Sequence, residues 1–169
     1  MKKITALLLC FIITLPLLFS CNNKDLKPGN TVGSICYTYN MPKIVGEGTD
    51  SIENHRGDIV VVHFFGTWCE NGEIAALDRL EKEKRKLTVL AIHSSHQNEE
   101  AKDFIESNYS DSDIIFLYDS SINNQEDKYY TALGGTDTYP YTLVLDKDGV
   151  IKAVKTGSFT YSEIKDIIY

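Results

Sequence analysis

The clearest pattern in the sequence is a run of apolar residues that ends in a turn containing glycine. Residues 59–65 are almost all apolar and rich in β-branched side chains, and Gly66 follows them directly. A run of this length is too short for a buried helix and is typical of a strand buried on both faces of a sheet. We therefore predict a central strand here, with Cys69 placed where the next helix should begin.

Strand and helix patterns alternate along most of the remaining chain. Further strands are predicted at residues 35–39, 87–92, 114–118, 141–145 and 150–156, and helices after residue 72 and at residues 98–109, 125–133 and 161–168. Thr160 and Glu163 have the spacing of a capping box, which marks the start of the last helix. Alternating elements followed by a hairpin and a helix predict an α/β fold, a mixed central sheet flanked by helices on both faces.

The first twenty residues have a different composition. Lys2 and Lys3 precede an apolar run at residues 4–19, which is the pattern of an export signal. The run ends in Leu-Phe-Ser-Cys, which resembles a lipobox, and this predicts a lipoprotein signal peptide at residues 1–20 with lipid attached to Cys21. A plain cleaved signal and a single membrane-spanning anchor are the alternatives. Each of them places the folded part outside the cytoplasm, in the cell envelope.

The rest of the chain divides into a short tether and one domain. Residues 21–34 are mostly polar and contain glycine and proline, so we predict a flexible tether. Residues 35–169 are long enough to bury a core without disulfide bonds. The formal net charge is −7, and it becomes −9 when Lys2 and Lys3 are left out, so nucleic acid is not expected as a partner.

The turn after the central strand carries the most specific motif. Residues 64–72, Phe-Phe-Gly-Thr-Trp-Cys-Glu-Asn-Gly, resemble the segment Phe-Trp-Ala-Thr-Trp-Cys-x-x-Cys of the TlpA/ResA-type extracytoplasmic thiol-disulfide oxidoreductases. The resemblance covers about residues 51–169 and implies a thioredoxin-like fold with Cys69 as the nucleophile. Trp68 is then expected beside the reacting sulfur. Gly72 stands where that family has its second cysteine.

A second segment far along the chain supports the same resemblance. Residues 135–146 resemble the family segment Gly-x-Pro-Thr-x-x-x-Ile-Asp-x-x-Gly, in which the proline is cis and faces the active cysteine. The resemblance therefore implies a cis peptide bond before Pro140, close to Cys69, with the backbone of Tyr139 pairing with an extended substrate. Judged from composition alone, an ordinary trans-proline turn is the alternative.

Thiol-disulfide exchange needs one thiolate to attack and a second thiol to resolve the mixed disulfide. A helix N-terminus stabilises the thiolate of Cys69, but Gly72 cannot act as the resolving group. Cys10 lies in the leader and Cys21 is the predicted lipid site, so Cys36 is the remaining candidate for a resolving cysteine within the chain. A small thiol or a partner protein would serve the same purpose.

Two main interpretations follow, and the sequence leaves open whether the protein is an enzyme. The first is a membrane-anchored monothiol oxidoreductase acting on thiols or disulfides of exported proteins through Cys69, with Trp68, Gly72, Tyr139 and Pro140 as supporting and docking residues. A membrane thiol reductase is then a further partner. The second is a non-catalytic binding module that has lost the resolving cysteine.

A peroxidase-like or metal-binding role on the same fold is a weaker alternative. Thr67 is the only part of the residue set expected for peroxidase chemistry, and His93 and His96 could approach Cys69 at neighbouring strand ends. Such histidines are more often surface groups, and we predict no metal ion and no cofactor.

Overall fold

The structure is a computed structural model, and it describes residues 26–69, 72–94, 99–120 and 128–169. The predicted signal peptide and Cys21 lie outside the described residues. In the described part of the chain, no helix has the length and apolar character needed to cross a bilayer.

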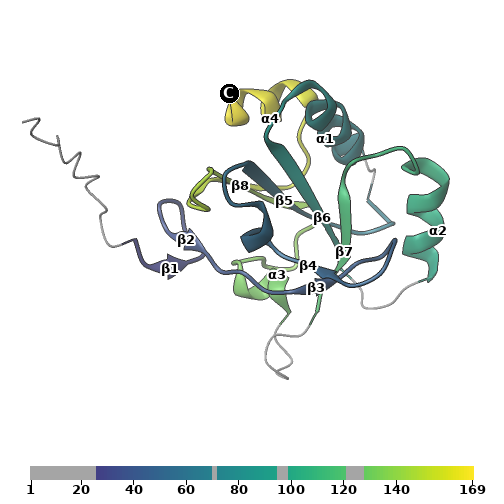
Figure 1. Cartoon of the computed structure of the whole chain (residues 1–169), viewed down its shortest axis with the longest axis horizontal. Helices are drawn as coiled ribbons and strands as arrows, with labels where there is room; N and C mark the ends of the chain where they lie inside the picture. Colours follow the sequence, from purple (N-terminus) through teal and green to yellow (C-terminus); the bar gives the residue numbers. More distant parts are fainter. Residues whose placement is uncertain (1–25, 70–71, 95–98, 121–127) are drawn as a thin grey trace, which may run out of the picture.

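A five-stranded mixed sheet forms the centre of the molecule (Figure 1). Its strands, in spatial order, are β7 (Ile115–Tyr118), β6 (Leu87–His93), β5 (Ile59–Phe65), β8 (Tyr141–Leu145) and β9 (Ile151–Thr156). The strands β5, β6 and β7 are parallel, whereas β8 runs antiparallel to β5 and β9 antiparallel to β8. The predicted central strand is confirmed, since β5 has neighbours on both edges.

Apolar side chains cover both faces of this sheet. On one face, alternate residues of the strands pack against three helices, α1 (Gly72–Glu83), α2 (Glu99–Asn108) and α4 (Tyr161–Ile168). On the other face they pack against α3 (Tyr129–Ala132) and the N-terminal segments. Val61 and Phe65 belong to the first core, and Val62 and Phe64 to the second. The predicted fold class, a mixed sheet flanked by helices on both faces, is therefore confirmed.

The N-terminal part differs from the sequence-based expectation. Four two-residue strands occur here, namely β1 (Pro28–Gly29), β2 (Ile35–Cys36), β3 (Met41–Pro42) and β4 (Thr49–Asp50). The predicted strand at residues 35–39 is limited to β2, and Pro28–Gly29 pairs with it from within the predicted tether. Met41–Pro42, where a break was expected, pairs with β4 in a hairpin whose turn contains Gly46 and Gly48, both at positive φ.

The helix predicted at residues 125–133 is shorter than expected. Of the described residues in this range, only Tyr129–Ala132 (α3) are helical, since Lys128 has an extended backbone. Residues 125–127 lie outside the described part. The helix ends before Gly134, which has a φ of 90°, in agreement with the predicted stop signal. The capping box of α4 is confirmed, since Thr160 Oγ1 accepts from the Glu163 backbone and Glu163 accepts from the Thr160 backbone.

Candidate functional site

The turn that follows β5 presents Cys69 at the end of the sheet. The backbone N–H of Cys69 donates to the carbonyl of Gly66 at 3.0 Å, and α1 begins three positions after the cysteine, beyond residues that the structure does not describe. The indole of Trp68 lies over Gly66, where an added Cβ would come within 2.5 Å of the ring. Glycine at position 66 therefore allows the ring to fold back over the strand end.

A cis peptide bond forms the wall opposite this turn. The Tyr139–Pro140 bond is cis, as the resemblance implied, and it directly precedes β8. Tyr141 is paired with Phe64, so the start of β8 lies beside the end of β5. This antiparallel pairing brings Pro140 next to the cysteine turn, about seventy positions away in the sequence.

Both walls line one open groove of about 430 Å³. Its lining residues are Trp68, Cys69, Asp137, Thr138, Tyr139, Pro140 and Ser158. The structure thus brings together four of the predicted site residues, Cys69, Trp68, Tyr139 and Pro140. Asp137 and Thr138 lie within the segment 135–146 but had no predicted role there, and Ser158 lies outside the predicted motifs.

Aromatic contacts hold the groove in shape. The ring of Tyr139 stacks on Tyr130 at a centroid distance of 4.5 Å, and the Trp68 ring meets Tyr139 edge to face at 6.0 Å. The hydroxyl of Tyr130 donates to the Thr138 carbonyl and accepts from the Thr138 N–H, at 2.9 and 3.0 Å. Tyr130 therefore fixes the loop that carries Tyr139 and Pro140.

His93 contacts the cysteine turn through a hydrogen bond and a ring contact. It is the last residue of β6 and is fully buried, and its Nε2 accepts from the Thr67 N–H at 3.3 Å. Its ring also meets the Trp68 ring edge to face at 6.1 Å. Within the described residues, no group of three or more histidine, cysteine, aspartate or glutamate side chains could hold a metal ion. His96, the second residue of the metal alternative, lies outside this part.

A buried carboxyl group lies behind the groove. Asp119 follows β7, and one of its oxygens accepts from the Tyr129 N–H at 3.0 Å. Its other oxygen has no hydrogen-bond partner among the described residues. Burial raises the pKa of Asp119 to about 6. Burial also raises the pKa of Tyr139, and the negative charge of Asp119 adds to this effect.

The structure does not bring Cys36 to the groove. Cys36 is 2% exposed, and its N–H donates to Gly149 in the hairpin at the far end of β8. With a rise of roughly 3.4 Å per residue, the strand between the two cysteines is about 17 Å long, whereas a disulfide requires Cα atoms within ~7 Å. Burial raises the pKa of the Cys36 thiol to about 12. Both Cys36 and Cys69 are free thiols.

Gly72 is the first residue of α1 and is exposed. A Cβ added at this position would meet no described heavy atom within 4 Å. Glycine is therefore not required by packing against the described residues. A longer side chain, including cysteine, has room there.

Two curated proteins resemble this chain in sequence, although no family model matches it. The thioredoxin-like protein YneN of Bacillus subtilis is 27% identical over 132 residues, which is 75% of this chain and 72% of YneN. The thiol-disulfide oxidoreductase ResA of Geobacillus thermodenitrificans is 24% identical over 165 residues, which is 95% of this chain and 90% of ResA.

Solved structures share the fold. A DsbF homologue from Corynebacterium diphtheriae superposes with a TM-score of 0.67 at 23% identity, covering 80% of this chain and 85% of the homologue. The pneumococcal exposed lipoprotein thioredoxin Etrx1 superposes with a TM-score of 0.63 at 18% identity, covering 78% of this chain and 98% of Etrx1. The chain therefore has a thioredoxin-like fold, and a thiol-disulfide oxidoreductase is among its relatives in sequence.

Proposed function

We propose that this protein is a membrane-anchored, extracytoplasmic thiol-disulfide oxidoreductase that works with a single active-site thiol. The observation that carries the proposal is the placement of Cys69 in an open groove, facing a cis proline and flanked by aromatic rings. The relationship to a thiol-disulfide oxidoreductase supports the same chemistry. Exported proteins that contain cysteines are the proposed substrates.

In the proposed reaction the thiolate of Cys69 attacks a disulfide of the substrate. A bond forms between Cys69 Sγ and one substrate sulfur while the substrate disulfide breaks, and the second sulfur leaves as a thiolate. In this step the Cys69 sulfur is oxidised and the leaving sulfur is reduced. The product is a mixed disulfide between the protein and its substrate.

Release of this mixed disulfide requires a thiol from outside the domain. Gly72 has no sulfur, and Cys36 lies buried at the other end of β8. A second cysteine of the substrate would complete an isomerisation. A small thiol or a membrane thiol reductase would instead return Cys69 to its reduced form.

The groove also offers a surface for docking an extended polypeptide. The exposed ring of Trp68 and the ring of Tyr139 give apolar contact in the groove that Cys69 lines. The backbone of Tyr139, held by the cis bond, would pair with the substrate chain in the manner of an added strand. The same contacts would serve the alternative, a binding module without catalysis, and the absence of sulfur at Gly72 favours that alternative.

The proposed cellular location rests on the leader. Residues 1–20 are proposed as a lipoprotein signal peptide and Cys21 as the lipidated residue, which would anchor the domain at the outer side of a bacterial membrane. Etrx1, which shares the fold, is itself an exposed lipoprotein.

Trapping in cells distinguishes the two candidate functions. We expect wild-type protein to form mixed disulfides with exported proteins through Cys69, visible on non-reducing gels after acid quenching. The Cys69→Ser variant should form none, and Cys36→Ser should behave as wild type. Binding of the same partners by Cys69→Ser, with no adduct in the wild type, would instead show a non-catalytic module.

A further inference from the structure

Among the described residues, the groove contains one charged side chain, and it is acidic. Of the described residues that line it, Asp137 alone carries a charged side chain, and no lysine or arginine is among them. Asp137 is exposed and has a φ of 52°, a left-handed conformation that aspartate and asparagine adopt more readily than most residues. The loop therefore holds an acidic side chain at the rim of the groove, two residues before Tyr139.

Two lysines of neighbouring elements are engaged elsewhere. Lys128 interacts electrostatically with Asp119, and its Nζ donates to the carbonyl of Ser94 at 2.7 Å. Lys155 on β9 pairs with Glu163 at 3.9 Å. Neither lysine lines the groove, so the negative potential of Asp137 is not cancelled from within it.

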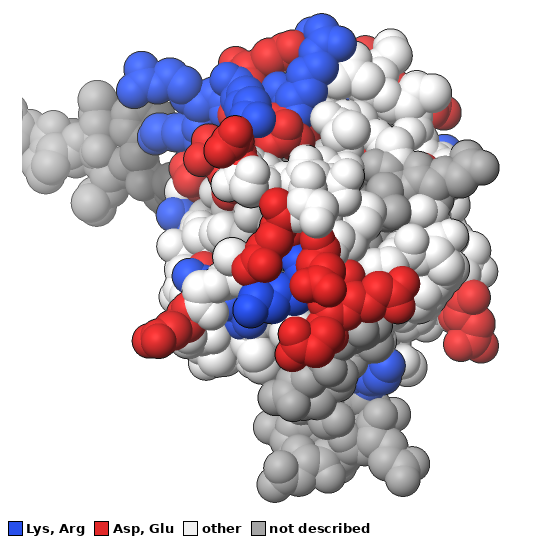
Figure 2. Space-filling view, turned by 90° about the vertical axis from the view of Figure 1, so that its right-hand side faces the viewer, with Lys and Arg blue, Asp and Glu red and all other residues white. Residues whose placement is uncertain are grey.

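Further acidic groups extend this potential beyond the groove. The hydroxyl of Thr67, two residues before Cys69, donates to Glu100 at 3.4 Å, which ties the first turn of α2 to the cysteine turn. Glu99 and Asp103 are exposed on the same helix, where Lys102 pairs with Glu106 at 4.0 Å, and Figure 2 shows acidic side chains gathered around basic ones on this face. The helix α2 thus carries an excess of negative charge beside the cysteine turn.

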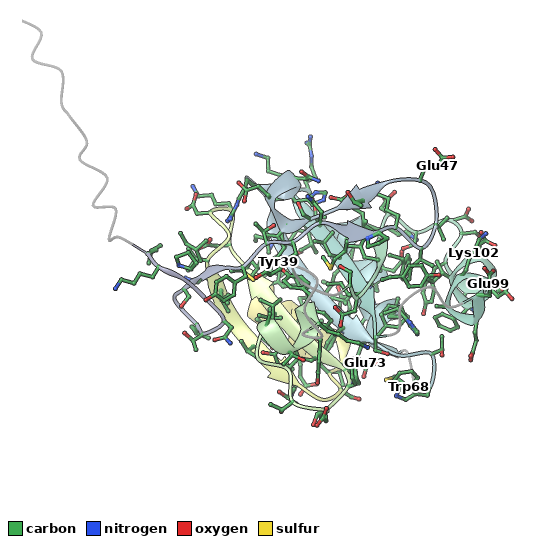
Figure 3. All side chains as sticks on the ribbon, turned by 90° about the horizontal axis from the view of Figure 1, so that it is seen from below. Tyr39, Glu47, Trp68, Glu73, Glu99 and Lys102 are labelled. Atoms are coloured by element: carbon green, nitrogen blue, oxygen red, sulfur yellow. The ribbon has the colours of Figure 1, made fainter. Side chains whose placement is uncertain are left out.

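The aromatic rings of the groove suit the same kind of ligand. Trp68 is 67% exposed and projects from the edge of the molecule in Figure 3. One face of the Tyr139 ring is covered by Tyr130, so the exposed ring of Trp68 offers the main π surface of the groove. Lysine and arginine bind such faces through cation–π contacts, tryptophan being the strongest partner.

We propose that the groove selects polypeptide substrates that carry lysine or arginine next to the reacting cysteine. This inference rests on the proposed function, because it concerns the substrate of the same thiol. The acidic rim would pair with the basic side chain, the rings of Trp68 and Tyr139 would cover its aliphatic part, and Cys69 would attack the adjacent disulfide. Acidic segments would be repelled by Asp137.

The test uses blocked peptides with one cysteine, flanked on both sides by lysine, glutamine or glutamate, each oxidised to its symmetrical disulfide dimer. Attack by Cys69 on either sulfur then gives the same adduct and releases one peptide thiol. Full-length protein in mild detergent is mixed with each dimer, and the adduct at Cys69 is followed by mass spectrometry. Cys69→Ser identifies any adduct formed at another cysteine.

Flanking charges also change the intrinsic reactivity of a disulfide. Each rate is therefore divided by the rate of the same dimer with 2-mercaptoethanol, an uncharged thiol. We expect the normalised rate for the lysine peptide to exceed that for the glutamate peptide about fivefold at low salt, the size expected for one partly exposed ion pair. High salt should reduce the ratio toward one.

Asp137→Asn removes the charge and keeps a side chain that tolerates positive φ, so the fold and the adduct should persist while the ratio falls toward one. Asp148→Asn, in the β8–β9 turn at the opposite end of β8, is the charge-matched control and should keep the full ratio. Equal normalised rates in the wild type, or an unchanged ratio in Asp137→Asn, would overturn the basic preference alone. Failure of all three peptides to form an adduct would overturn the proposed function as well.

Discussion

At the scale of single residues, position 72 carries glycine where the resemblance to the oxidoreductases implied a second cysteine. Gly72 begins α1 in open surroundings, and packing against the described residues does not require a glycine there. The missing thiol therefore changes the chemistry of the site and not its backbone. The groove, the cis proline and the supporting tyrosines are all present without the second thiol. One substitution is therefore enough to test whether the rest of the site is competent.

We expect Gly72→Cys to convert the protein into a dithiol oxidoreductase. A thiol three positions after Cys69 can attack the mixed disulfide from within the chain, so release no longer needs an external thiol. Reduction of a protein disulfide with a regenerating reductant should speed up by at least about tenfold, since the slow intermolecular step becomes intramolecular.

Gly72→Ser is the matched control for this experiment. It adds a side chain of the same shape without the sulfur and should leave the rate at the wild-type value. An equal gain in both variants would trace the effect to helix stability instead of resolution.

A second residue-scale prediction concerns His63 in the central strand. His63 lies in the apolar run at residues 59–65, and it is 1% exposed, with Nδ1 2.8 Å from the hydroxyl of Thr142. Burial lowers the pKa of His63 to about 3. The unfolded chain binds a proton at this histidine near pH 6.5, whereas the folded chain does not until about pH 3.

Between these two pKa values the unfolded state holds one proton more than the folded state, so stability falls as the pH falls. At about pH 5 the loss from His63 amounts to about 2 kcal/mol relative to neutral pH. His63→Asn keeps a hydrogen-bonding group toward Thr142 and should remove this part of the acid sensitivity. Urea unfolding of both proteins between about pH 7 and pH 4 measures the difference.

Asp119 and Glu81 have raised pKa values and act in the opposite direction, but they are the same in both proteins. Their contribution therefore cancels in the comparison. Parallel pH profiles of the two proteins would contradict the assignment to His63.

At the scale of elements, the strands and helices that contain long apolar runs are the ones whose positions the sequence predicts best. β5, β6 and β8 are marked by long runs of β-branched or aromatic residues and lie close to the predicted positions. Met41–Pro42 and α3 are only two and four residues long, so the local sequence pattern predicts them poorly. Contacts with distant parts of the chain determine whether such short segments form. Asp137 lies in the predicted segment 135–146, but its role at the groove depends on the conformation of the loop before Pro140, which no short window contains. Ser158 was missed because only the pairing of β9 with β8 brings it to the groove.

The last helix provides a test at this scale. Thr160 caps α4 through a side-chain contact with the Glu163 backbone, and the helix packs its buried isoleucines onto the first core. Thr160→Ala should lower the free energy of unfolding by about 1 kcal/mol, because a backbone donor loses its partner. Ser162→Ala, at an exposed position inside the helix, should have little effect. Equal losses in both variants would argue against the cap.

At the scale of the whole molecule, the sequence predicts a lipid anchor on Cys21, which precedes the folded domain. If Cys21 carries lipid, cells grown with labelled fatty acid should transfer the label to this protein. We expect Cys21→Ala to abolish the labelling, as measured by immunoprecipitation and gel electrophoresis. Cys10→Ala, in the part of the leader that would be discarded, should keep the label. An unlabelled wild-type protein would favour a plain signal or a membrane-spanning anchor.

The position of Trp68 gives the molecule a built-in optical reporter. It is the single tryptophan of the sequence, it directly precedes Cys69, and two thirds of its surface are open to solvent. A disulfide quenches indole emission at contact distance, so fluorescence should dim when a mixed disulfide forms at Cys69 and recover when the partner leaves. Stopped-flow measurements on the unlabelled protein can therefore time formation and release of the proposed mixed disulfide separately.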